Sequence, residues 1–269
     1  MSKLAFEYNI RSELPSRPED PAALGTRFLN TLDALSRIDP KVFHDWEVVT
    51  YPAAASLSLE TARPRIAAII KKAVYRDDLR QPRPDQGYTA GALVINDDKS
   101  RNISLRINAG GAKKGDSSLE MGEWNVFPDP AIVTYPPSRR RCSAIVANWP
   151  PNWACAFAFR SNTARIPETY AGGVQGYRLE SLPMVPNDPT FEDSAFHIPW
   201  IAYLSAPLAT GIMLPGEIIT EHTPDDGLLM IASTDRLDPE NHEHLERARL
   251  IVNTMLSRTG YSTYASHRE

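Results

Sequence analysis

The sequence predicts an α+β domain in which about four helices pack on a largely antiparallel or mixed β-sheet. Segments of alternating apolar residues, typical of strands, are interleaved with segments of helical periodicity. Their order, β-α-β-α-β-β-α-β followed by more strands and a last helix, lacks the strict alternation of a doubly wound sheet. Because no Gly/Ser linker divides the 269 residues, we expect a single domain over residues 1–269.

The first third of the chain is predicted to contain two strands, at 4–10 and 46–51, and two helices, at 21–38 and 64–74. In both helices apolar residues recur every three or four positions, so one face can pack on the sheet. Both also begin at a proline, which suits a first turn because the backbone N–H there has no helical partner to lose.

A hairpin is expected next, with strands at 88–95 and 103–107 separated by polar turn residues. The following segment, 110–118, mixes glycines and lysines as phosphate-binding loops do. It lacks the order G-x-x-x-x-G-K-[ST], and no helical pattern begins directly after it. We therefore expect a solvated loop there.

The second half is predicted to contain a helix at 137–149 and a strand at 153–159. Between 160 and 199 the periodicity is weak, and glycines and prolines lie among scattered aromatic residues. An irregular segment of this length inside a domain is usually functional. Three further strands are expected, at 200–204, 211–214 and 218–221.

The clearest local pattern is a strand, a turn and a helix near the C-terminal end. The apolar run 228–232 follows the turn residues Asp226 and Gly227 and is expected to be a buried strand. The last helix is predicted to start with Asp238 as its N-cap and Pro239 in its first turn. We expect this unit to hold the sheet, and the polar residues 260–269 to form a frayed tail.

Composition argues against several function classes. The formal charge of -4 is unfavourable for binding nucleic acid, whose phosphates require a surplus of lysine and arginine. No apolar run approaches the roughly 20 residues that span a bilayer, and the first residues do not form a signal peptide. We therefore expect a soluble, cytoplasmic protein that binds neither nucleic acid nor membrane. Cys142 and Cys155 lie in apolar surroundings and are expected to be buried, reduced thiols.

No catalytic or cofactor-binding motif is evident. The sequence has no G-x-S-x-G elbow, no S-x-x-K and no G-x-G-x-x-G, so we expect no cofactor and no catalytic residue. Carboxylate pairs, such as the one at Asp225 and Asp226, occur where turns are expected, and turn formation explains them. Two aromatic segments, 149–153 and 199–204, are expected to pack in the core. The alternatives are that their ring edges reach a binding surface or that they support self-association.

The start of the last helix contains two histidines that could suggest a metal site. His242 and His244 are two residues apart, roughly 200° around a helix axis, so they cannot share an ion as an i, i+4 pair can. A solvated helix start, with no metal, is therefore expected. The alternative function is a metal-dependent hydrolase with a site near His222, His242 and His244. That site would require the preceding hairpin to fold over the start of the helix.

Several segments carry a resemblance to a known family. They are FLNTLDALSRIDP at 28–40 with a tryptophan soon after, WPPNWA at 149–154, WIAYLS at 200–205, and DGLL at 226–229 with DPENHEHLERAR at 238–249. In this order, and over nearly the whole chain, they resemble the immunity protein 52 family. One departure is visible: the family often has two glycines before the last strand, whereas here Asp226 precedes Gly227.

The resemblance implies a small cytosolic antitoxin that works by binding, without catalysis. Its partner would be a cognate nuclease toxin domain with a restriction-endonuclease-like fold, delivered by a type VI secretion system (T6SS). The resemblance leaves open whether the toxin cuts DNA or RNA, and whether inhibition covers the active site or blocks an oligomer. The acidity of the chain would then complement a basic nuclease cleft.

We place the toxin contact in the segment 160–199, because it combines acidic residues and tyrosines with a lack of core periodicity. The candidate partner-binding residues are Glu168, Tyr170, Tyr177, Glu180, Asp188, Glu192 and Asp193.

Overall fold

The computed structural model describes residues 6–51, 55–95, 102–112, 117–123, 135–160, 163–170, 174–181, 198–238 and 240–260. Its strands are β1 (Phe6–Glu13), β2 (Glu47–Thr50), β3 (Ala55–Ser58), β4 (Tyr88–Ile95), β5 (Asn102–Ala109), β6 (Ser118–Glu123), β7 (Trp153–Arg160), β8 (Thr163–Tyr170), β9 (Val174–Ser181), β10 (Ile198–Leu204), β11 (Ile219–His222) and β12 (Leu228–Ile231). Its α-helices are α1 (Pro21–Ile38), α2 (Leu59–Ala62), α3 (Ile66–Lys72), α4 (Tyr135–Asn148), α6 (Ala206–Ala209) and α7 (His242–Thr259), and short 3₁₀ turns are η1 (Arg63–Arg65) and η2 (Pro84–Gln86).

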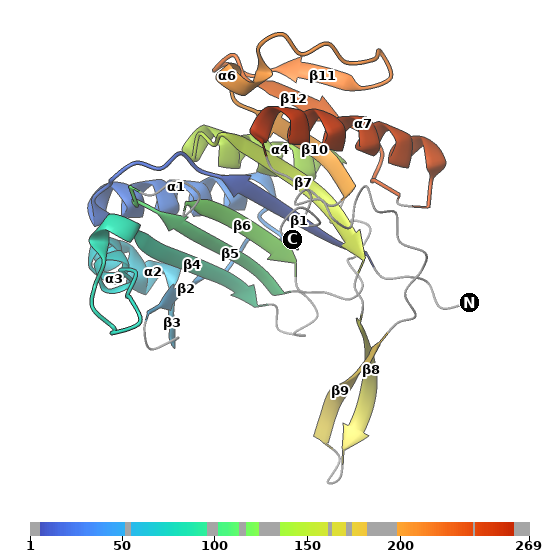
Figure 1. Cartoon of the computed structure of the whole chain (residues 1–269). Helices are drawn as coiled ribbons and strands as arrows, with labels where there is room; N and C mark the ends of the chain where they lie inside the picture. The colour runs from blue at the N-terminus through green and yellow to red at the C-terminus, as the bar shows by residue number, and fades with distance from the viewer. Residues whose placement is uncertain are drawn as a thin grey trace.

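Ten of these strands form one sheet, in the order β11-β12-β10-β7-β1-β6-β5-β4-β2-β3. The pairings between neighbouring strands are antiparallel. Helices α1 and α4 lie behind this sheet in Figure 1, and α7 lies in front of β10 and β12. The α+β class with a largely antiparallel sheet is therefore confirmed, as are four longer helices within the described residues, α1, α3, α4 and α7.

The burial of the strands follows from this arrangement of helices. On β5, Ile103, Leu105 and Ile107 are buried, whereas Arg106 between them is exposed, so one face of the sheet is open there. By contrast, all four residues of β12 are buried, so both faces of the sheet are covered at this end, and α7 lies in front of it in Figure 1. Strands that are covered on both sides are expected to be continuous apolar runs, as 228–232 is.

Helix α1 has the bounds that the sequence predicts, and local interactions explain this. The carboxylate of Asp20 accepts the N–H groups of Ala22 and Ala23, and Pro21 occupies the first position. Gly25 allows α1 to approach α3 closely, because a Cβ there would lie 3.0 Å from Cγ2 of Ile66. The apolar face of α1 then packs fully, with Leu24, Phe28, Leu32 and Leu35 buried.

Helix α7 begins later than the sequence predicts. The side chain of Asn241 accepts the N–H groups of Glu243 and His244, so Asn241 is the N-cap. Asp238, the predicted cap, instead accepts the N–H of Glu240 in a turn before the helix. The helix ends at Gly260, whose left-handed conformation (φ 71°) closes the last turn. The expected frayed tail lies, apart from this residue, outside the described residues.

Other expectations are corrected by the structure. Residues 211–214 do not form a strand, because the short helix α6 precedes them and Gly211 has a left-handed backbone. The second helix is divided into α2, η1 and α3 and starts at Leu59, where the hydroxyl of Ser58 caps it. Strands β3 and β6 were not expected, although Leu119 and Met121 of β6 show the alternation of a half-buried strand.

Both cysteines are buried, reduced thiols, as expected. Burial raises the pKa of Cys142 to about 12 and also raises that of Cys155, so neither is a reactive thiolate at neutral pH. None of the helices in the described part of the chain combines the length and apolarity needed to cross a membrane.

Candidate partner-binding surface

The segment that was expected to be irregular contains a β-hairpin. Strands β8 and β9 pair antiparallel along their whole length, from Thr163 opposite Ser181 to Tyr170 opposite Val174. They form a separate two-stranded sheet, which extends away from the ten-stranded sheet in Figure 1. A hairpin outside the core has no face to bury against it, and this explains why the segment shows no core periodicity.

Four of the candidate contact residues lie on this hairpin. Glu168 and Tyr170 are on β8, and Tyr177 and Glu180 are on β9. Strand positions alternate between the two faces, so Glu168, Tyr170 and Glu180 occupy positions of one face and Tyr177 a position of the other. The other three candidates, Asp188, Glu192 and Asp193, lie outside the described residues.

The structure does not support a solvated position for His244. Its ring is buried, Nδ1 accepts the backbone N–H of Asp238 at 3.0 Å, and Nε2 lies 3.1 Å from Oγ of Ser233. Because a backbone N–H can only donate, Nδ1 is unprotonated and Nε2–H is the donor to Ser233. The imidazole therefore fixes the turn before α7, and both of its nitrogens are engaged within the protein.

The other two histidines of the alternative metal site, His222 and His242, are both exposed. His242 has a side chain 85% exposed, with Nε2 3.4 Å from Glu246 one helical turn away. His222 ends β11, opposite Leu228 in the sheet. Across the described part of the chain, no group of three or more His, Cys, Asp or Glu side chains could hold a metal ion.

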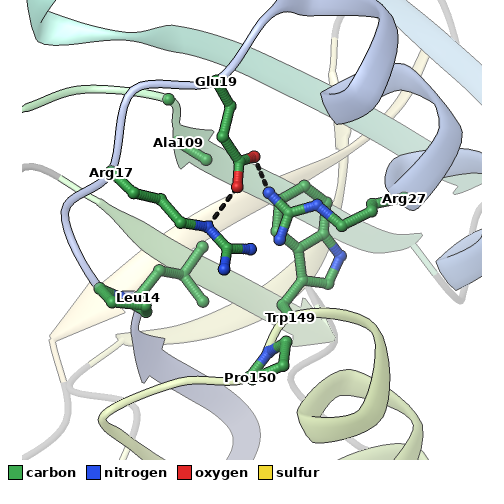
Figure 2. A pocket seen from close by; sticks show the side chains of 9 residues that line it. Leu14, Arg17, Glu19, Arg27, Ala109, Trp149 and Pro150 are labelled. Carbon is green, nitrogen blue, oxygen red and sulfur yellow. Dashed lines mark ion pairs between the residues drawn. The ribbon is translucent and has the colours of Figure 1, made fainter.

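The aromatic segment 149–153 packs in the core beside a cluster of charges (Figure 2). The carboxylate of Glu19 pairs with both Arg17 and Arg27, and the guanidinium of Arg27 lies 4.2 Å from the ring centroid of Trp149. Trp149 donates from Nε1 to the hydroxyl of Thr31 at 2.7 Å. Burial, with a smaller effect of Arg17, lowers the pKa of Arg27 to about 10. This cluster joins the β1–α1 connection, α1 and the end of α4.

The cavity beside this cluster is too small for a ligand. Its volume is about 10 Å³, enough for about one water molecule. The second aromatic segment is also internal: Trp200 donates to the carbonyl of Ser233 at 2.9 Å, and Tyr203 donates to Asp225 at 2.6 Å. Gly227 is required beside it, since a Cβ there would lie 2.4 Å from the Tyr203 ring. Core packing therefore accounts for both segments.

An open groove of about 940 Å³ lies on the surface. The sequence does not predict it, because its walls come from several separate elements. It lies between the end of α1 with the loop 39–46 and the α2–η1 turn. Its lining residues are Ser36, Pro40, Phe43, His44, Asp45, Trp46, Glu47, Ser58, Leu59, Glu60, Arg63 and Pro64. The guanidinium of Arg63 is paired in two hydrogen bonds with Asp33, so the remaining charged lining is mainly acidic.

Comparisons with known proteins show a likeness to a solved structure but no family. No family model and no curated protein matches the sequence, so membership of the immunity protein 52 family is not shown. Among solved structures, the chain is similar to a T6SS protein of Pseudomonas aeruginosa, PA0821. The two are 12% identical with a TM-score of 0.50, over 93% of this chain and 73% of that one. At this identity the likeness shows a shared fold.

Proposed function

We propose that this chain is an immunity protein that binds and neutralises a toxin delivered by a type VI secretion system. The observation that carries the proposal is the shared fold with a T6SS protein over 93% of the chain. The resemblance of the segments at 28–40, 149–154, 200–205 and 226–249 to the immunity protein 52 family supports the same role. Within this proposal the partner is a cognate nuclease toxin domain, and the antitoxin acts in the cytoplasm.

The proposed mechanism is direct binding without turnover. The alternative hydrolase would need a site near His222, His242 and His244, and the engaged ring nitrogens of His244 argue against its use as a ligand or base. Neutralising a lethal enzyme requires a complex that persists at low concentrations. We therefore expect a dissociation constant in the nanomolar range or below, equivalent to about -12 kcal/mol or more favourable.

The β8–β9 hairpin supports this mechanism by its position. It extends from the sheet, so it can enter a partner without any rearrangement of the core (Figure 1). Glu168 and Glu180 occupy positions of the same face as Arg178, so this face carries a net charge of -1. We expect the two carboxylates to meet basic groups of the nuclease cleft and to accelerate association. We propose this face, with Tyr170, as a contact surface, together with Tyr177 and the residues Asp188, Glu192 and Asp193.

Co-expression tests the proposal. The toxin-like nuclease encoded next to this chain should kill a host when expressed alone, and the host should survive when this chain is present. The purified chains should then form a complex that calorimetry and gel filtration detect. If the host survives although the two purified chains do not associate, binding is not the mechanism. If the host still dies although this chain is folded and abundant, the assignment as an immunity protein fails.

A further inference from the structure

The connection between α3 and β4, residues 73–87 and here named the anchor loop, exposes apolar side chains on a fixed backbone. Leu79 is 80% exposed and Tyr75 is 52% exposed. Within the described residues only two other large apolar side chains are exposed, Met213 and Ile219, near the opposite edge of the sheet. Isolated exposed apolar residues need no explanation, but two on one projecting loop do.

Backbone hydrogen bonds hold the base of the anchor loop. Tyr75 N–H donates to the carbonyl of Gly87 at 2.9 Å, and Arg83 N–H donates to the carbonyl of Tyr75 at 2.7 Å. Closer to the tip, Asp77 N–H donates to the carbonyl of Gln81 at 3.1 Å. The two sides of the loop are therefore joined along its length, as in a short hairpin.

The tip of the loop is fixed by one side chain. Oδ1 of Asp77 accepts the N–H groups of Leu79 at 3.0 Å and Gln81 at 2.9 Å. Arg80 has a left-handed backbone (φ 60°), and its N–H donates to the carbonyl of Asp77 at 2.8 Å. These bonds fix the backbone that carries Leu79, so little backbone freedom remains to be lost when a partner covers it.

The loop is also attached to the sheet at its end. The N–H of Ala112 donates to the carbonyl of Asp85 at 2.8 Å. Gly87 has a φ of 93° and lies so close to β5 that a Cβ would be 2.5 Å from the carbonyl oxygen of Ala109. The loop therefore keeps a fixed position on the molecule, beside α3 in Figure 1.

The charge of this region differs in sign from that of the whole chain. Lys71, Lys72, Arg76 and Arg80 are exposed, and none of them has an ion-pair partner among the residues that the structure describes. Arg76 donates to the carbonyl of Arg80, which is a neutral acceptor. The nearby acids are fewer, Asp77 and Asp78, and Asp85 is paired with Arg83. Residues 71–85 therefore contain five basic and three acidic side chains, a net charge of +2, on a protein with a formal charge of -4.

We propose that the anchor loop inserts Leu79 into an apolar pocket on an acidic surface of a partner protein. Tyr75 would cover the rim of that pocket, and Arg76 and Arg80 would meet carboxylates around it. An apolar side chain at the centre of a contact, with polar and charged groups at its rim, is the general arrangement of protein interfaces. Nucleic acid fits less well, because an exposed leucine gains nothing from phosphates. The inference rests on the proposed function, in which the partner is the toxin.

The test compares Leu79→Ser with Met213→Ser in the full chain. Both side chains are largely exposed, so both variants should fold with unchanged melting temperatures. Leu79→Ser should weaken toxin binding about 50-fold, mainly through faster dissociation, whereas Met213→Ser should leave it unchanged. The charge variant Arg76→Glu/Arg80→Glu should slow association about tenfold at low salt, and the difference should shrink as salt is raised.

Each outcome separates the two proposals. If the wild-type chain binds the toxin and Leu79→Ser binds equally well, the inference that the anchor loop contacts the toxin is wrong, and the proposed function stands. If the wild-type chain forms no complex, the proposed function is wrong, and so is the inference about the anchor loop. Fluorescence anisotropy with a labelled DNA duplex is a further control. DNA binding that is lost in Arg76→Glu/Arg80→Glu but kept in Leu79→Ser would reassign the loop to nucleic acid and overturn the inference.

Discussion

The anchor loop and the β8–β9 hairpin both project from the ten-stranded sheet, but they are held differently (Figure 1). The loop is bound to the rest of the fold through Gly87 against Ala109 and through Asp85 to Ala112. The hairpin's strands pair with each other. Segments whose conformation is fixed before binding lose less entropy in a complex. We therefore expect the loop to set the lifetime of the complex, and Glu168 and Glu180 of the hairpin to contribute to its rate of formation.

The largest effect on the loop should come from its attachment point. Gly87→Ala should lower the free energy of unfolding by about 2–4 kcal/mol, because the added Cβ would clash with Ala109 and a φ of 93° is strained for alanine. Urea denaturation measures this change. Gly216→Ala is the matched control, since no atom lies within 4 Å of the added Cβ, and its stability should change by less than about 0.5 kcal/mol. Equal stability of the two variants would contradict a fixed attachment.

The hairpin should respond to charge. Replacing three candidate acids of the segment 160–199 by lysine, two on the hairpin and one after it, in Glu168→Lys/Glu180→Lys/Asp188→Lys, should weaken toxin binding at least about tenfold, chiefly by slowing association at low salt. Surface plasmon resonance separates the two rates. Glu217→Lys is a charge control at an exposed position between α6 and β11 and should have little effect. Unchanged affinity in the triple variant would remove the hairpin from the interface.

A smaller effect is expected at the tip of the anchor loop. Asp77→Ala removes the acceptor for the N–H groups of Leu79 and Gln81, so the loop becomes more mobile and toxin affinity should fall about fivefold. Asp77→Asn keeps an acceptor oxygen and should retain most of the affinity. Amide hydrogen exchange at Leu79 should rise in the alanine variant and much less in the asparagine variant. Equal affinities for both variants would show that the rigidity of the tip is unimportant.

The smallest effect concerns the ion pair at the end of the loop. Its hydrogen bond with Arg83 holds the pKa of Asp85 below the ordinary value of 3.8. A lowered carboxyl pKa contributes stability above the unfolded-state pKa, and that contribution disappears as pH falls through the folded-state pKa. Because the pair is exposed, Asp85→Asn should hardly change the melting temperature at neutral pH. Carboxyl NMR titration should give a pKa below 3.8, and a value above it would exclude the pairing in solution.

Helices α1 and α7 show which features of a helix can be predicted from the sequence. The signals for α1 are local: Asp20 and Pro21 start the helix, and a regular apolar face defines its length. At α7 the same signals predict a start that is three residues too early, because Asp238 and Asn241 are both residue types that cap helices well. The buried contacts of His244 select Asn241. Element boundaries depend on such tertiary choices.

The candidate sites depend on contacts between residues far apart in the sequence. Nothing local to Leu79 shows that it stays exposed, since its loop is fixed through partners as distant as Ala109 and Ala112. Likewise, the groove between α1 and α2 gathers residues from several elements. The hairpin of β8 and β9 is not predicted from the sequence, because its strands lack the alternation of apolar and polar residues that identifies a strand at the core.

The central claim is that this chain neutralises a toxin by binding it. The most direct test is the equilibrium affinity between the purified full chain and the nuclease domain encoded next to it, measured by calorimetry. We predict a defined stoichiometry and a dissociation constant in the nanomolar range or below. No detectable complex at micromolar concentrations, with both proteins folded and the host still protected, would contradict the claim.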